Sequence, residues 1–101
     1  MIFKVKFLPA SKGDIDEIFS WYEKQNKIAA KKFLIGLRSK LKYIQKHPLH
    51  CQVVYKGIRS ILIDKFPYQI HFLVEEDTSL IIVFSITHTS RDPEVWKKRL
   101  K

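Results

Sequence analysis

The spacing of apolar residues changes from helical to extended near Pro48, and this change limits the folds that the chain can adopt. Between Ser11 and Pro48, apolar side chains recur every three or four residues, which predicts amphipathic helices. After it, short runs rich in Val, Ile, Phe and Tyr alternate with turn residues, which predicts strands. A chain of 101 residues has room for one domain only. We therefore expect a single α+β domain over residues 1–101, with helices packed on one face of a sheet.

Two helices are predicted between Ser11 and Pro48. Ser11 and Asp14 are candidate caps of the first helix, with acidic residues in its first turn. Its apolar stripe consists of Ile15, Ile18, Phe19 and Tyr22. Trp21 lies off this stripe. A break at residues 24–27, with Asn26 as a cap, leads into the second helix, whose stripe consists of Ala30, Phe33, Leu34, Leu37, Leu41 and Ile44. So short a connection predicts an antiparallel hairpin, with the lysines of the second helix in solvent.

Five strands are predicted, at residues 1–7, 51–55, 58–64, 68–75 and 80–87. Strands joined by short turns pair antiparallel, so the last four should form a meander. Strict alternation in the last hairpin would put these residues on the face that meets the helices: Tyr68, Ile70, Phe72, Val74, Ile82, Phe84, Ile86 and His88. The opposite face would hold Leu73, Ile81 and Val83 at one end and a polar patch of Gln69, His71, Ser85 and Thr87 at the other. A polar patch on an apolar sheet is a candidate site.

The tail after this hairpin predicts one more short helix. Asp92 is a suitable cap, Pro93 suits the first helical position, and Glu94 suits the first turn. Val95, Trp96 and Arg99 would lie on this helix.

The charge of the chain favours an anionic partner. Nineteen Lys and Arg against ten Asp and Glu give a net charge of +9, which attracts polyanions or an acidic protein without choosing between them. The single cysteine, Cys51, cannot form an internal disulfide, and no apolar run is long enough to span a membrane, so we expect a cytoplasmic protein. His47, His50 and Cys51 lack a fourth metal ligand at a suitable spacing, and there is no glycine-rich phosphate loop. We expect neither a metal nor a cofactor.

Three short segments carry a resemblance to a known family. They are Ile58-Arg59, Phe66-Pro67-Tyr68 and His88-x-x-Arg91-Asp92-Pro93-x-x-Trp96. In this order, after a helix that runs from Ala29 to Pro48, they resemble the RelE/ParE family of type II toxins, on the side of the ParE-like and plasmid-stabilisation proteins. The resemblance implies a strand, a helical hairpin on a mainly antiparallel sheet and a basic tail.

The resemblance also implies growth inhibition by a toxin that an antitoxin neutralises in a hetero-oligomer, and the charge suggests that the antitoxin is acidic. ParE-like members poison DNA gyrase, whereas RelE-like members cleave messenger RNA on the ribosome. In RelE-like enzymes an arginine follows the tyrosine of the third meander strand, whereas Gln69 follows Tyr68 here. The neutral Gln69 favours inhibition of DNA gyrase as the function, or a degenerate toxin that only binds its antitoxin. The basic and aromatic residues of the tail favour a ribonuclease.

A ribonuclease without a metal needs a base, an acid and cations that hold the phosphate. His88, Arg91 and His71 are the candidates for this catalysis. The residues expected to bind a target are Arg59, Tyr68, Gln69, Trp96 and Arg99. Each has a structural alternative as well. His88 could anchor the tail, His71 could be an exposed sheet residue, Arg91 could fix the tail through Asp92, and Arg59 could pair with Asp64 or Glu75.

Overall fold

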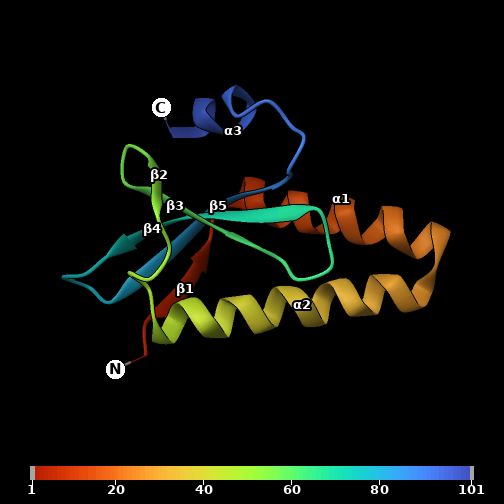
Figure 1. Ribbon diagram of the computed structural model, residues 1–101, viewed down its shortest axis with the longest axis horizontal. Coiled ribbons are helices and arrows are strands. Elements are labelled where there is room, and N and C mark those ends of the chain that lie inside the picture. Colours follow the sequence, from red (N-terminus) through yellow and green to blue (C-terminus); the bar gives the residue numbers. More distant parts are fainter. Residues whose placement is uncertain (1, 101) are drawn as a thin grey trace.

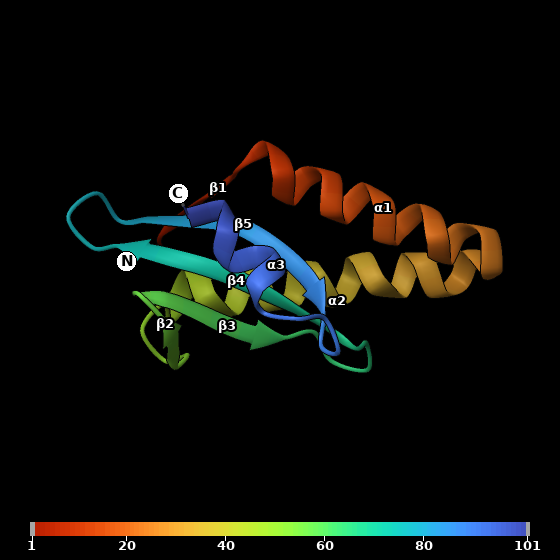
Figure 2. The same cartoon turned by 90° about the horizontal axis from the view of Figure 1, so that it is seen from above.

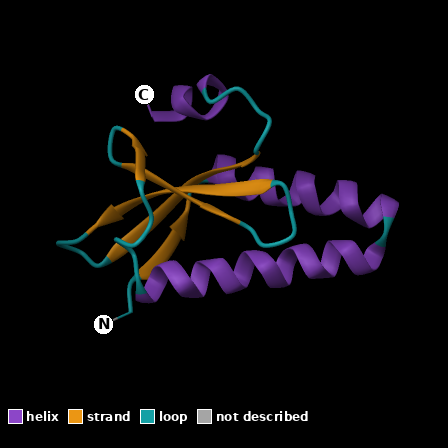
Figure 3. Ribbon diagram, viewed as in Figure 1, coloured by secondary structure: helices purple, strands orange, loops and turns teal. Residues whose placement is uncertain are grey.

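The computed structural model describes residues 2–100 and contains a helical hairpin, a five-stranded sheet and a short C-terminal helix (Figures 1 and 3). The elements are β1 (Lys4–Phe7), α1 (Pro9–Gln25), α2 (Lys27–Lys46), β2 (Val53–Tyr55), β3 (Ile58–Leu62), β4 (Tyr68–Glu75), β5 (Leu80–His88), α3 (Glu94–Lys97) and a final 3-10 turn (Lys98–Leu100). Within the described residues, no helix is both long and apolar enough to cross a membrane. The predicted α+β fold is confirmed.

The sheet has the strand order β1-β5-β4-β3-β2. β2 to β5 form the expected antiparallel meander, and β1 pairs parallel with β5 at one edge. The hairpin of α1 and α2 packs on one face of the sheet, and α3 lies over β4 and β5 on the other (Figures 1 and 2). The far end of the hairpin extends beyond the sheet (Figure 1).

Asn26 alone separates the two long helices and caps the second one. Its side-chain oxygen accepts hydrogen bonds from the backbone N–H groups of Ile28 and Ala29, at 2.9 and 3.4 Å. The predicted start of α1 is wrong. The helix begins at Pro9, because proline suits a first helical position, and Ser11 Oγ donates to the carbonyl of Leu8 instead of capping the helix.

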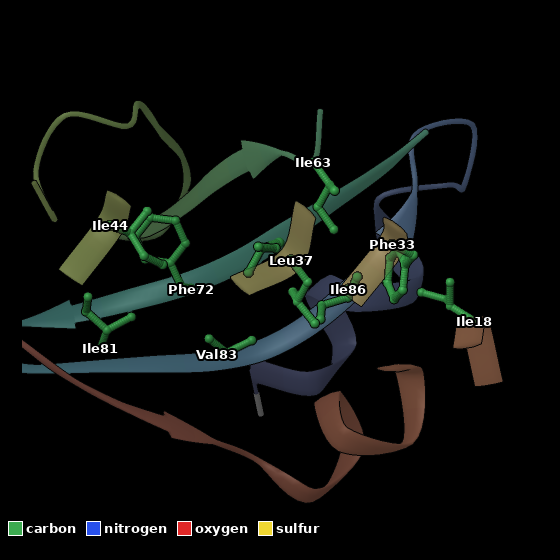
Figure 4. Packing of buried hydrophobic residues seen from close by; sticks show 10 residues of the cluster. Ile18, Phe33, Leu37, Ile44, Ile63, Phe72, Ile81, Val83 and Ile86 are labelled. Atoms are coloured by element: carbon green, nitrogen blue, oxygen red, sulfur yellow. The ribbon is translucent and has the colours of Figure 1, made fainter. Parts of the chain in front are cut away.

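The core lies between the sheet and the apolar stripe of α2, as predicted. Phe33, Leu37 and Ile44 point from α2 toward Ile81, Val83, Ile86 and Phe72 on the sheet (Figure 4). Ile18 is the buried contribution of α1 to this cluster. Trp21 is 56% exposed, in agreement with its place off the stripe.

The predicted alternation in the last hairpin is wrong for the first half of β5. His71 pairs with Ser85, but Phe72 pairs with Val83, so Phe84 is an extra residue that forms a β-bulge. Because the bulge shifts the alternation by one residue, Ile81 and Val83 face the helices. Phe84 instead belongs to a second cluster with Ile58 and Trp96, under α3.

Candidate functional site

A concave pocket of about 200 Å³ lies where the end of β5 meets α1, and we call it the end pocket. It is lined by Asp14, Glu17, Ile18, Trp21, Tyr68, Ile86, Thr87, His88 and Arg91. The sheet brings two of the predicted residues together here, because Tyr68 begins β4, His88 ends β5, and the two are paired in the strand register. Arg91 follows in the loop after β5.

The wall opposite the sheet is one face of α1. Asp14, Glu17, Ile18 and Trp21 follow the helical spacing of three and four residues, so their side chains lie on the same side of the helix. Ile18 is directed into the core, whereas Trp21 leaves most of its ring in solvent. The pocket therefore combines an exposed indole, two carboxylates, a phenol, an imidazole and the exposed guanidinium of Arg91.

Tyr68 belongs to both the pocket and the aromatic core. Its ring contacts Tyr22, Phe33 and His88 edge to face, with centroid separations of 6.3, 5.9 and 5.3 Å. Burial, and then the negative charge of Glu17, raises the pKa of the Tyr68 phenol. The phenol therefore stays protonated at neutral pH and is a hydrogen-bond donor for a ligand in the pocket.

His88 is held by the loop that follows it. The backbone N–H of Ser90 donates to His88 Nδ1 at 3.0 Å, and Ser90 Oγ lies 2.7 Å from the same nitrogen. Because Nδ1 is an acceptor, the proton of the neutral ring lies on Nε2. The loop then turns into α3, where Asp92 Oδ1 accepts from the backbone N–H of Glu94 at 3.0 Å, which confirms Asp92 as a cap. Arg91 is exposed beside these contacts.

His71 lies on the opposite face of the sheet, in a group that we call the covered patch: Ser60, His71, Ser85 and Thr87. His71 Nδ1 is 2.6 Å from Ser60 Oγ, and Nε2 is 3.0 Å from Thr87 Oγ1. Burial lowers the pKa of His71 to about 4. The sequence placed this polar patch correctly, but the alternative of an exposed His71 is wrong, because the ring is fully buried.

Trp96 and Arg99 hold the tail over the covered patch. The indole of Trp96 stacks on His71 with a centroid separation of 4.1 Å and is only 4% exposed, so its ring faces the interior. Arg99 donates to the carboxylate of Asp14 at 2.7 and 3.0 Å, and to the carbonyl of Phe84 at 3.2 Å. Asp14 also accepts from the backbone N–H of Ile86 at 2.9 Å, so it joins α1 to β5 and is not the predicted helix cap.

The other two predicted residues lie away from the end pocket. The Arg59 guanidinium donates to the carbonyls of Leu49 and Cys51, and so it orders the segment before β2 and does not form the ion pair with Asp64 or Glu75 that the sequence suggested. Gln69 is half-buried beside Thr87 in the strand register. Within residues 2–100, no three His, Cys, Asp or Glu side chains lie close enough to hold a metal ion together.

A family model of the ParE toxins of type II toxin-antitoxin systems matches residues 5–93. The chain belongs to this family. No curated protein matches the sequence of this ParE-family chain at a significant level.

Solved structures of both branches of the superfamily share the fold of this ParE-family chain. The chromosomal ParDE system of P. aeruginosa has a TM-score of 0.72 and 18% identity, over 86% of this chain and 96% of that one. A mutant of the E. coli toxin RelE in the free state has a TM-score of 0.70 and 14% identity, over 99% and 96%. The intact E. coli RelBE toxin-antitoxin complex has a TM-score of 0.64 and 14% identity, over 88% and 99%. These identities establish the fold alone.

Several residues that line the end pocket of this ParE-family chain, among them Glu17 and Trp21, were not predicted as site residues. The available signal was the position of Trp21 off the apolar stripe of its helix, which leaves a large aromatic side chain in solvent. The sequence suggested only that Glu17 is one of the acidic residues near the start of the first helix. The packing of α1 beside the end of β5 brings it to the pocket.

Proposed function

We propose that this ParE-family toxin acts by binding DNA gyrase and that an acidic antitoxin neutralises it. The proposal rests on the composition of the end pocket, where Trp21, Tyr68 and Arg91 line one concave surface. Tryptophan, tyrosine and arginine are the residue types that most often supply the binding energy of protein interfaces. The end pocket is therefore suited to receive a protein target.

The positions of the two histidines support binding over catalysis. His88 lines the end pocket, whereas His71 is buried on the other face of the sheet under Trp96. They cannot act as base and acid on one phosphate in this arrangement. Glu17 also lines the end pocket, and its negative charge disfavours an RNA phosphate there, whereas the charge of Asp14 is compensated by its ion pair with Arg99.

The second candidate function is cleavage of messenger RNA on the ribosome. One observation favours it, because the end pocket does bring His88, Arg91 and Tyr68 together. In such an enzyme His88 would transfer a proton and Arg91 would hold the scissile phosphate. Gln69 remains at the position where RelE-like enzymes have an arginine, and a neutral amide cannot supply that fixed positive charge.

Two assays on one preparation of the full chain separate these functions. A gyrase poison inhibits DNA supercoiling or traps cleaved DNA, and it leaves ribosome-bound messenger RNA intact. We expect this result. Cleavage of the messenger RNA without an effect on gyrase would contradict the proposal, and inactivity in both assays together with tight antitoxin binding would point to a degenerate toxin.

The antitoxin part of the proposal is tested in cells. The net charge of +9 predicts that a small acidic protein encoded beside this chain binds it, more weakly as salt increases. Expression of the chain alone should arrest growth, and co-expression with the acidic protein should restore it. Harmless expression of the chain alone at a high level would contradict the toxin function.

A further inference from the structure

The turn after β5 places a serine hydroxyl against an imidazole nitrogen. Ser90 Oγ lies 2.7 Å from His88 Nδ1, and the backbone N–H of Ser90 donates to the same nitrogen at 3.0 Å. A backbone N–H can only donate, so Nδ1 is an acceptor and the Ser90 hydroxyl directs its proton toward it. A serine whose proton points at the unprotonated nitrogen of a histidine has the arrangement that activates serine nucleophiles.

Two backbone hydrogen bonds fix the turn that carries this pair. The N–H of Thr89 donates to the carbonyl of Pro67 at 2.8 Å, which ties the turn to the start of β4. The N–H of Arg91 donates to the carbonyl of His88 at 2.9 Å, which closes the turn itself. Ser90 lies between them and is exposed. A reagent in solution can therefore reach a hydroxyl that is already oriented.

A second serine–histidine pair has the same contact in different surroundings. Ser60 Oγ lies 2.6 Å from His71 Nδ1 in the covered patch, where Trp96 stacks on the imidazole. The ring of His71 is fully buried, and burial lowers its pKa to about 4, so it is a weak base as well as an inaccessible one. The pair at Ser90 is the one that is open to solvent, and the pair at Ser60 is its natural control.

Donors that suit a phosphoryl group lie beside Ser90. Arg91 is the next residue and is exposed, and a guanidinium binds phosphoryl oxygens through paired N–H groups. The phenol of Tyr68, which stays protonated, is a further donor in the end pocket. The carboxylate of Glu17 comes from α1, on the opposite wall. The net charge of +9 also attracts anionic phosphorus compounds to the chain.

We propose that Ser90 is a nucleophile and a covalent modification site, which takes up a phosphoryl group from a phosphoric anhydride of the nucleoside triphosphate class. Ser90 Oγ forms a bond to the terminal phosphorus, and the bond from this phosphorus to the bridging oxygen breaks. The nucleoside diphosphate leaves with the electron pair, and the hydroxyl proton passes to His88 Nδ1. Arg91 then holds the oxygens of the new phosphate.

This modification regulates the end pocket, and that step rests on the proposed function. A phosphate on Ser90 adds up to two negative charges beside Arg91, and it withdraws the guanidinium from a protein target. Ser90→Asp adds negative charge at this position, and Ser90→Asn has the same shape without the charge. We expect Ser90→Asp to inhibit gyrase about tenfold more weakly than Ser90→Asn. Equal inhibition by the two variants would overturn the regulatory step.

The reactivity of Ser90 is tested with a dye-labelled alkyl fluorophosphonate and the full chain near neutral pH. The serine oxygen attacks phosphorus, fluoride leaves, and mass spectrometry of peptides locates the label. We expect Ser90 to be labelled about tenfold or more faster than Ser39, which is an exposed serine of α2. Ser60 should stay unlabelled, because its histidine is covered. Labelling of Ser90 no faster than that of Ser39 would overturn the proposal.

His88→Asn distinguishes activation of the hydroxyl from ordering of the turn. The side-chain oxygen of asparagine can accept the backbone N–H of Ser90 in place of Nδ1, but it cannot take up the hydroxyl proton. Labelling of Ser90 should therefore fall about tenfold or more. Equal labelling in His88→Asn and the wild type would mean that the contact only orders the turn. Thermal unfolding of each variant confirms that it folds.

Inhibition of gyrase by the unmodified chain is measured separately. Fast labelling of Ser90 in a chain that does not inhibit gyrase leaves the modification site in place and removes the proposed function. Inhibition of gyrase by a chain whose Ser90 is not labelled removes this inference alone.

Discussion

Asp14 in α1 and Arg99 in the C-terminal turn form a two-pronged ion pair between residues 85 positions apart in the chain. The same carboxylate accepts the backbone N–H of Ile86, so one acidic side chain joins α1, β5 and the tail. The hydrogen bond to Asp14 raises the pKa of Arg99 further. Both side chains are largely shielded from water, so the pair contributes more to stability than an ion pair on the surface does.

Removing the arginine tests the importance of this pair. Arg99→Gln should lower the free energy of unfolding by about 1–3 kcal/mol, because the shielded carboxylate of Asp14 loses its charged donor. Asp14→Asn should have a cost of similar size. If the pair acts as a unit, the double variant costs clearly less than the sum of the two single variants in denaturant unfolding. Additive costs would show that the two residues act independently.

The pKa of His71 predicts a loss of stability in acid. Burial lowers this pKa to about 4, from 6.5 in the unfolded chain. Between these two values the unfolded chain binds a proton that the folded chain does not, so stability decreases as the pH falls from about 6.5 to 4. At about 1.4 kcal/mol per pKa unit, the loss attributable to His71 reaches about 3 kcal/mol. No effect is expected above pH 7.

Chemical unfolding at pH 7.5 and at about pH 4.5 measures this loss. His71→Gln keeps a donor and an acceptor but does not titrate, so it is the matched control, and its stability should decrease less between the two conditions. If the wild type and His71→Gln lose the same stability in acid, other groups cause the acid sensitivity.

The core face of α2 gives a prediction that depends on sequence periodicity alone. Leu37→Ala should lower the free energy of unfolding by about 2–5 kcal/mol, because Leu37 is buried between α2 and the sheet and its removal leaves a cavity. Lys42→Ala on the outer face of the same helix should change stability by less than about 0.5 kcal/mol. Equal losses in urea unfolding would mean that the helix is rotated from the arrangement in Figure 4.

Local rules were enough to predict most of the fold. The apolar stripe of α2, the cap at Asn26 and the antiparallel meander of β2 to β5 all depend on neighbouring residues, and the structure confirms them. The parallel pairing of β1 with β5 was not predicted. The bulge at Phe84 could not be predicted, because it places Phe84 against Trp96, a residue of another element. The partner of Asp14 was unpredictable for the same reason, because Arg99 lies at the other end of the chain.

The candidate site was predictable in part. Tyr68, His88 and Arg91 follow from short motifs, and the strand register brings them to the end pocket. The sequence could not show that Trp96 covers His71. Both side chains combine polar and apolar groups, so each is compatible with an exposed position as well as with a buried one. Nor could it show that Arg59 is bound to backbone carbonyls, which carry no signal in the sequence.

The last prediction concerns the target and distinguishes binding from catalysis at the same pocket. If the end pocket receives gyrase, Trp21→Ala and Arg91→Ala should each weaken gyrase inhibition about tenfold or more, because the exposed indole and guanidinium lose contacts with the target. His88→Ala should weaken it less, since the imidazole is held by Ser90. Val53→Ala is the control, because Val53 is half exposed on β2, away from the pocket. The measurement is the concentration of toxin that halves supercoiling.

If the toxin is a ribonuclease, the effects of Trp21→Ala and His88→Ala should be reversed in order, with the larger loss of activity in His88→Ala. His88→Ala and Arg91→Ala would abolish cleavage of ribosome-bound messenger RNA, because the first removes the proton-transfer group and the second the cation at the phosphate. Gln69→Arg would raise the activity, since it restores the positive charge that RelE-like enzymes have at this position. Trp21→Ala would then affect the KM more than the kcat, because an indole contributes to binding and not to proton transfer. Messenger RNA cleavage that disappears in His88→Ala, with gyrase unaffected by the wild type, would replace the gyrase proposal with the ribonuclease.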